Sequence, residues 1–93
     1  MKPPTYSPRE QEVLERPAGY KIHVYTGQSG RKECSKLFTA AQALEQAELV
    51  EKLYPSYRAL VYAVRYFGEE REERMAHVTK AHLSALIQLT ENQ

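Results

Sequence analysis

Nucleophilic chemistry in this 93-residue chain would depend on a single cysteine, Cys34, and on three histidines. Catalysis needs such a group to lie in a pocket beside a base that activates it. A hairpin predicted over residues 20–38 decides whether Cys34 has such a base. A four-residue loop at 27–30 would place His23 opposite Cys34. A five-residue loop would instead place Cys34 opposite Val24, on the buried face of the hairpin.

The five-residue loop is the favoured register because it keeps the apolar side chains of the hairpin together. A shift by one residue moves every side chain of a strand to the other face of its sheet. Free cysteine commonly behaves as a small apolar residue. We therefore expect Cys34 to be a half-buried structural residue and the protein not to be an enzyme.

Metal chemistry has little support in the residue types and their spacing. His77 and His82 are five residues apart, whereas two ligands on one helical face lie three or four apart. The chain has no aspartate and no second cysteine, so a site for a hard cation would depend on glutamate alone. The glutamates of 69–73 are interleaved with Arg71 and followed by Arg74, which is typical of a solvated turn. We expect neither a metal nor a cofactor.

The composition predicts one small domain spanning residues 1–93. Apolar residues make up 42% of the chain, without a run long enough to cross a membrane. A single cysteine cannot form an internal disulfide, and no signal-peptide pattern opens the chain, so we expect a cytoplasmic protein. The net charge of +1 excludes bulk electrostatic attraction to nucleic acid.

The hydrophobic pattern predicts an α+β fold in ββαββα-like order. Its sheet is mainly antiparallel with three or four strands, its helices pack on one face, and a short N-terminal helix begins after Ser7. Residues 74–79 could instead begin a long C-terminal helix, but β-branched Val78 and Thr79 favour a strand. The other expected elements are a flexible arm at 1–6, a hairpin at 20–38, a helix at 40–54, a central strand at 57–67 and a helix at 80–90.

The strand at 57–67 has two unlike faces because successive side chains of a strand alternate. One face carries small apolar residues and the other carries tyrosines; the first consists of Ala59, Val61 and Ala63, the second of Leu60, Tyr62, Val64 and Tyr66. We expect the alanine-rich helix 40–54 to pack on the face with the small apolar residues, which would leave the tyrosines on the open side of the sheet. The alternative is that Tyr62 and Tyr66 pack beneath a terminal helix.

Positive charge is concentrated in the hairpin, where four cationic side chains stand against one glutamate between residues 20 and 38. Rigid aromatic rings beside cations form either a protein-binding hot spot or a platform for stacking bases. We expect a protein partner, with nucleic acid as the alternative and a homodimer through a sheet edge or the tyrosine face as a third arrangement. The expected contact residues are Lys21, Tyr25, Arg31, Lys32, Lys36, Arg58, Tyr62, Arg65 and Tyr66.

The hairpin from Tyr20 to Phe38, the helix capped by Thr39 and the strand that ends at Phe67 together resemble the layout of small phage and mobile-element proteins, anti-CRISPR inhibitors among them. The resemblance covers about two thirds of the chain. It implies a stoichiometric inhibitor that uses a charged and aromatic surface to occupy a protein or nucleic-acid site of its partner.

Overall fold

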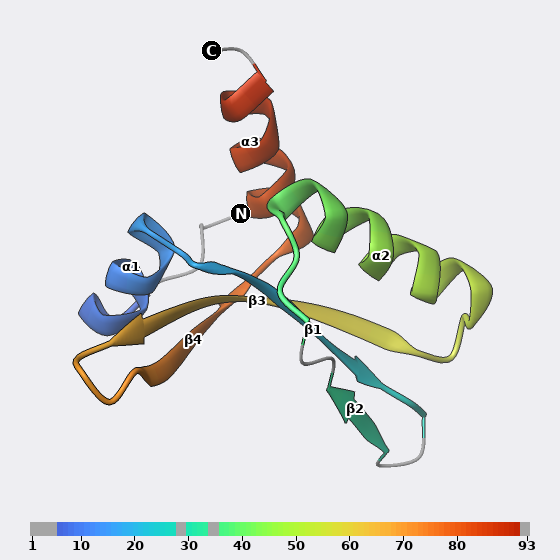
Figure 1. Ribbon diagram of the computed structural model, residues 1–93. Helices are drawn as coiled ribbons and strands as arrows, with labels where there is room; N and C mark the ends of the chain where they lie inside the picture. Colours follow the sequence, from blue (N-terminus) through green and yellow to red (C-terminus); the bar gives the residue numbers. More distant parts are fainter. Residues whose placement is uncertain (1–5, 28–29, 34–35, 92–93) are drawn as a thin grey trace.

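The computed structural model describes residues 6–27, 30–33 and 36–91 (Figure 1). Its four strands are antiparallel to their neighbours in the order β2-β1-β3-β4. This is the expected α+β fold with a short N-terminal helix. Residues 1–5, most of the expected arm, and Cys34 lie outside the described residues. The elements are α1 (Pro8–Glu15), β1 (Gly19–Tyr25), β2 (Arg31–Glu33), α2 (Ala40–Leu53), β3 (Arg58–Phe67), β4 (Glu72–Val78) and α3 (Lys80–Glu91).

Local side-chain contacts determine where α1 and α2 begin. The Thr39 hydroxyl accepts a hydrogen bond from the Gln42 amide at 3.2 Å, and the Gln42 side chain accepts one from the Thr39 amide at 3.1 Å. Ser7 and Glu10 form the same reciprocal pair at the start of α1. These capping boxes satisfy amides that the first helical turn leaves without partners.

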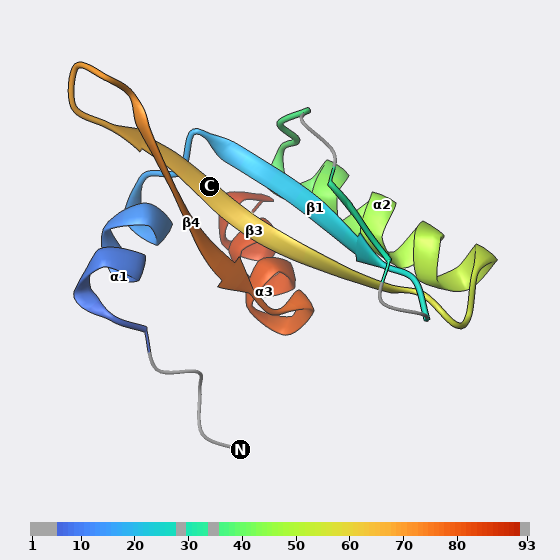
Figure 2. The ribbon, with the colours of Figure 1, turned by 90° about the horizontal axis from the view of Figure 1, so that it is seen from below.

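All three helices contribute to one core on one face of the sheet. Figure 1 shows them on the upper side of the sheet, and Figure 2 views the sheet from below, from the opposite side. Val13 of α1 and Leu83 of α3 are almost completely buried in the same cluster as the side chains of α2. The sheet therefore has a covered face and, among the described residues, a face without a helix.

The covered face of β3 consists of the small residues expected to seat α2. Ala63 is fully buried, and so are Ala43 and Ala47 of α2. Small side chains on both elements allow the helix to approach the strand closely. The C-terminal end of α2 extends past the core, and Leu53 and the C-cap residue Tyr54 are 61% and 52% exposed there.

Residues 72–78 form the strand β4 rather than the start of a long helix. A turn at 68–71 reverses the chain after β3, with Gly68 at a φ of 73° and Arg71 at 54°. Pairing then starts at once, with Phe67 opposite Glu72, so the strand begins two residues earlier than the expected 74.

The hairpin register differs from both expected registers. His23 lies opposite Glu33 and Tyr25 opposite Arg31, so the connection comprises the five residues 26–30. The loop has the favoured length of five residues but begins one residue earlier than the 27–31 that would place Cys34 opposite Val24. The Thr26 amide and hydroxyl both donate to the Gly30 carbonyl, at 2.9 and 3.2 Å, and close the loop at this position. A Cβ at position 30 would collide with that hydroxyl, so the arrangement depends on glycine.

Among the described residues of the second half of the hairpin, Arg31–Glu33 form β2, and Phe38 forms an isolated bridge to Tyr20. The interpretation of Cys34 as half-buried lies outside the described residues.

Candidate binding surface

The face of the sheet opposite the helices, here called the open face, is defined by strand register. Directly paired residues of an antiparallel sheet project to the same side, and successive residues alternate. The register therefore places on the open face Lys21, His23 and Tyr25 of β1, Arg31 and Glu33 of β2, Arg58, Leu60, Tyr62, Val64 and Tyr66 of β3, and Glu73, Met75 and His77 of β4.

Three rings form an aromatic row across the middle of the open face. The ring centroid of Tyr62 lies 4.6 Å from that of His23 and 5.5 Å from that of His77, with interplanar angles of 41° and 53°. His23 is only 5% exposed, and Val64 beside the row is fully buried although it is outside the core cluster under the helices. Neighbouring side chains of the open face therefore cover His23 and Val64.

Two phenol groups and a guanidinium meet at one end of the row. Burial raises the pKa of Tyr62, as does a hydrogen bond with Tyr25, while the nearby Arg31 charge acts in the opposite direction. Tyr25 itself lies directly between Arg31 and Arg58, opposite one on β2 and opposite the other on β3. We call these three residues the arginine row.

The other end of the open face carries a neutralised charge pair. Lys21 Nζ lies 2.8 Å from Glu73 Oε2, and this hydrogen bond raises the pKa of Lys21. The Arg71 guanidinium lies over the Tyr66 ring, 5.1 Å from its centroid. Charge at this end is thus engaged within the protein.

The surplus positive charge lies in the arginine row. Arg31 pairs with Glu33 at 2.6 Å, but both side chains are about half exposed, so the pair is weak. No ion pair joins Arg58 to another described residue. Arg58 also borders a cavity of about 290 Å³ whose lining includes Leu60 and His77 of the open face. The other charged groups of that cavity are Glu51 and Lys80, which pair with each other.

The structure brings together six of the nine expected contact residues on the open face: Lys21, Tyr25, Arg31, Arg58, Tyr62 and Tyr66. It separates Lys32, Lys36 and Arg65 from them. Lys32 lies opposite Val24 and therefore projects to the helix side, where it lines a hollow with Phe38. Lys36 lies over the Phe38 ring, 5.4 Å from its centroid.

Arg65 has a structural contact instead of an exposed position on the open face. It shares the covered face with Ala63, because both are odd-numbered residues of β3. Its guanidinium donates to the Glu12 carbonyl of α1 at 2.8 Å. Arg65 and Tyr66 therefore project to opposite sides of the sheet, because adjacent residues of a strand alternate.

Sequence reasoning missed His23, His77, Met75 and Glu73 as members of the same surface. The alternation within β1 could have assigned His23 to the face of Tyr25. The residues of β4 could not be assigned in this way, since their neighbours depend on the pairing of β4 with β3.

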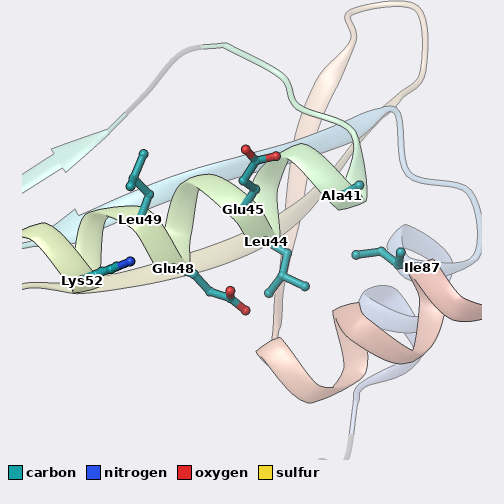
Figure 3. A pocket seen from close by; sticks show the side chains of 7 residues that line it. All are labelled: Ala41, Leu44, Glu45, Glu48, Leu49, Lys52 and Ile87. Atoms are coloured by element: carbon teal, nitrogen blue, oxygen red, sulfur yellow. The ribbon is translucent and has the colours of Figure 1, made fainter.

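A groove between α2 and α3 is the largest hollow among those described, with a volume of about 450 Å³. Leu44 and Ile87 point toward one another across it, and Glu45, Glu48 and Lys52 line its sides (Figure 3). It contains no histidine and no serine, threonine or cysteine nucleophile. None of the expected contact residues borders this groove.

Comparisons with protein-family models, curated proteins and solved structures give no match for this chain. Within residues 6–27, 30–33 and 36–91, no three side chains of histidine, cysteine or acidic type gather as metal ligands would. In that same part of the chain, no helix has the length and apolar character needed to cross a membrane.

Proposed function

We propose that the protein is a non-catalytic binding module that contacts a protein partner through the open face of its sheet. The observation that carries this proposal is the aromatic row on a face that no described helix covers. Tyrosine and histidine rings offer apolar area together with a polar edge, which suits a surface that is wet in the free protein and dry in a complex. Rings that already pack against each other lose little side-chain entropy on binding.

The charge arrangement favours a protein partner over nucleic acid. Among the strand residues of the open face, Lys21 and Arg31 are each paired with a glutamate. A surface that tracks a phosphate backbone needs several cations free to release counterions. A nearly balanced surface with aromatic rings at its centre instead resembles the core and rim of a protein interface.

The likeness in layout to small phage and mobile-element inhibitors supports a more specific form of the proposal. In that form the protein acts in the cytoplasm and occupies a functional site of its partner stoichiometrically. The ring-bearing face would supply the contact area, and no turnover would be required.

Site-specific photo-crosslinking tests the proposal. A benzophenone amino acid replaces Tyr66 at the edge of the open face in one variant and, in a control, Glu48, an exposed residue of α2 beside the groove between α2 and α3. Both variants are irradiated in lysate of the source cells. We expect a defined protein adduct from position 66 that is absent from position 48. The identified partner should then bind the purified wild-type chain in a one-to-one complex.

Three results would contradict the proposal. An adduct at position 66 that nuclease removes would assign the face to nucleic acid. The same assignment would follow if labelled single- or double-stranded DNA or RNA bound with an affinity that falls steeply as salt rises. Adducts of equal yield from both positions would show that the open face has no special role.

A further inference from the structure

The arginine row is a built arrangement of donors at one end of the open face. Neighbouring strands lie about 4.8 Å apart, so the Cα atoms of Arg31 and Arg58 are separated by about 10 Å with Tyr25 between them. Long side chains starting at that separation can both reach a group placed over the Tyr25 ring. The hydroxyl of Tyr25, close enough to Tyr62 to help raise its pKa, adds a polar group at the same place.

The protein itself shows which anion suits this row. The Glu33 carboxylate already binds the Arg31 guanidinium at 2.6 Å. Arg58 has the same fork of donors and no such carboxylate among the described residues, and the cavity beside it provides room for another side chain. Guanidinium groups bind carboxylates through paired, charge-assisted hydrogen bonds.

We propose that the arginine row receives one or two carboxylate side chains from an acidic segment of the partner, while the aromatic row holds apolar side chains of the same segment. This inference rests on the proposed function and names the chemistry of the partner. The row carries two guanidinium charges, one of them already paired with Glu33, so it matches one or two carboxylates rather than a polyanion, whose binding grows with the number of cations that it meets.

A peptide titration of the purified full chain tests the inference without the natural partner. The probe is a short acetylated peptide of alternating glutamate and leucine, and the control peptide has glutamine in place of glutamate. We expect saturable NMR shifts at the Tyr25 amide and at the guanidinium Nε–H groups of Arg31 and Arg58. The glutamine peptide should leave the guanidinium signals unchanged.

Substitutions of single arginines test whether the glutamate peptide binds at the arginine row. Arg58→Gln should weaken binding of the glutamate peptide about tenfold, which corresponds to about 1.4 kcal/mol. Arg58→Lys keeps the charge but loses the forked guanidinium, so its affinity for the glutamate peptide should lie between those of the wild type and Arg58→Gln. Arg9→Gln removes the same charge from the exposed surface of α1 and should bind like the wild type.

Equal weakening by Arg58→Gln and Arg9→Gln would overturn the inference, since it would show only bulk attraction. So would an oligonucleotide that shifts the same signals at lower concentration than the glutamate peptide, because the row would then be a phosphate site. If the position-66 adduct forms with a protein and the peptide does not bind, the partner chemistry is wrong while the proposed function stands. If that adduct does not form, the proposed function itself fails.

Discussion

Tyr62 of β3 packs its ring against that of His23 of β1, with centroids 4.6 Å apart, on a sheet face that no described helix covers. The two residues are not direct partners in the ladder, since Tyr62 lies opposite Lys21 and His23 lies opposite Leu60. Tyr62 therefore leans along the strand toward the arginine row. This diagonal contact buries the histidine and turns the open face into a packed surface rather than a set of separate side chains.

Replacement of Tyr62 tests whether this surface is separate from the core. We expect Tyr62→Ala to lower the free energy of unfolding by about 1–2 kcal/mol, through loss of its ring contacts, and to leave the chain folded. Tyr62→Phe should cost about 1 kcal/mol or less, because only the hydroxyl is lost. Leu83→Ala, in the fully buried core, should cost about 2–5 kcal/mol. Urea denaturation measures all three, and an unfolded Tyr62→Ala chain would show that the ring is core.

The two arginines at positions 58 and 65 should separate binding from stability. Arg65→Gln breaks the hydrogen bond to the Glu12 carbonyl and should destabilise the fold by about 1 kcal/mol without changing affinity for the glutamate peptide. Arg58→Gln should have the opposite effect, with unchanged stability and weaker binding. Urea denaturation and peptide titration of the same two variants check this, and a loss of affinity in Arg65→Gln would return that residue to the contact surface.

The close approach of α2 to β3 predicts intolerance of larger side chains at the fully buried Ala47. We expect Ala47→Leu to lower the free energy of unfolding by about 1–3 kcal/mol, because the added atoms force the helix away from the sheet. Ala41→Leu makes the same change on an exposed part of the same helix and should be nearly neutral. If both variants were nearly neutral, the contact between α2 and β3 would have room for the larger side chain.

Stability should fall in alkali. Burial is the main cause that raises the pKa of Tyr6, Tyr20 and Tyr62 above 10.0, and the hydrogen bond to Glu73 raises that of Lys21 above 10.5. Above pH 10 the folded state therefore holds more protons than the unfolded state, so its stability is lost as pH rises through the folded pKa values.

Urea denaturation on both sides of pH 10 measures this loss, and tyrosinate absorbance reports the titration. Tyr20→Phe removes one of the hydroxyls with a raised pKa, so the free energy of unfolding should fall less steeply with pH. Stability that is constant or increases above pH 10 would contradict the assignment.

The order of the elements follows from local signals, which is why the α+β fold was predictable. Thr39 and Gln42 cap a helix through contacts three residues apart, and the alternation of 20–25 indicates a half-buried strand. The hairpin register was not predictable in the same way. It depends on the hydrogen bond from the Thr26 hydroxyl to the Gly30 carbonyl. Single contacts of this kind decide which of several hairpin loops of similar length forms.

The sequence by itself determined the two faces of β3, because alternation along a strand is a property of neighbouring residues and needs no partner. It therefore identified Tyr62 and Tyr66 as one surface. Only the tertiary structure decided what surrounds them. His23 and His77 flank Tyr62 because β1 and β4 pair on either side of β3 in one particular register. Such pairing joins residues far apart in the chain, and its register depends on the packing of the whole sheet against the helices.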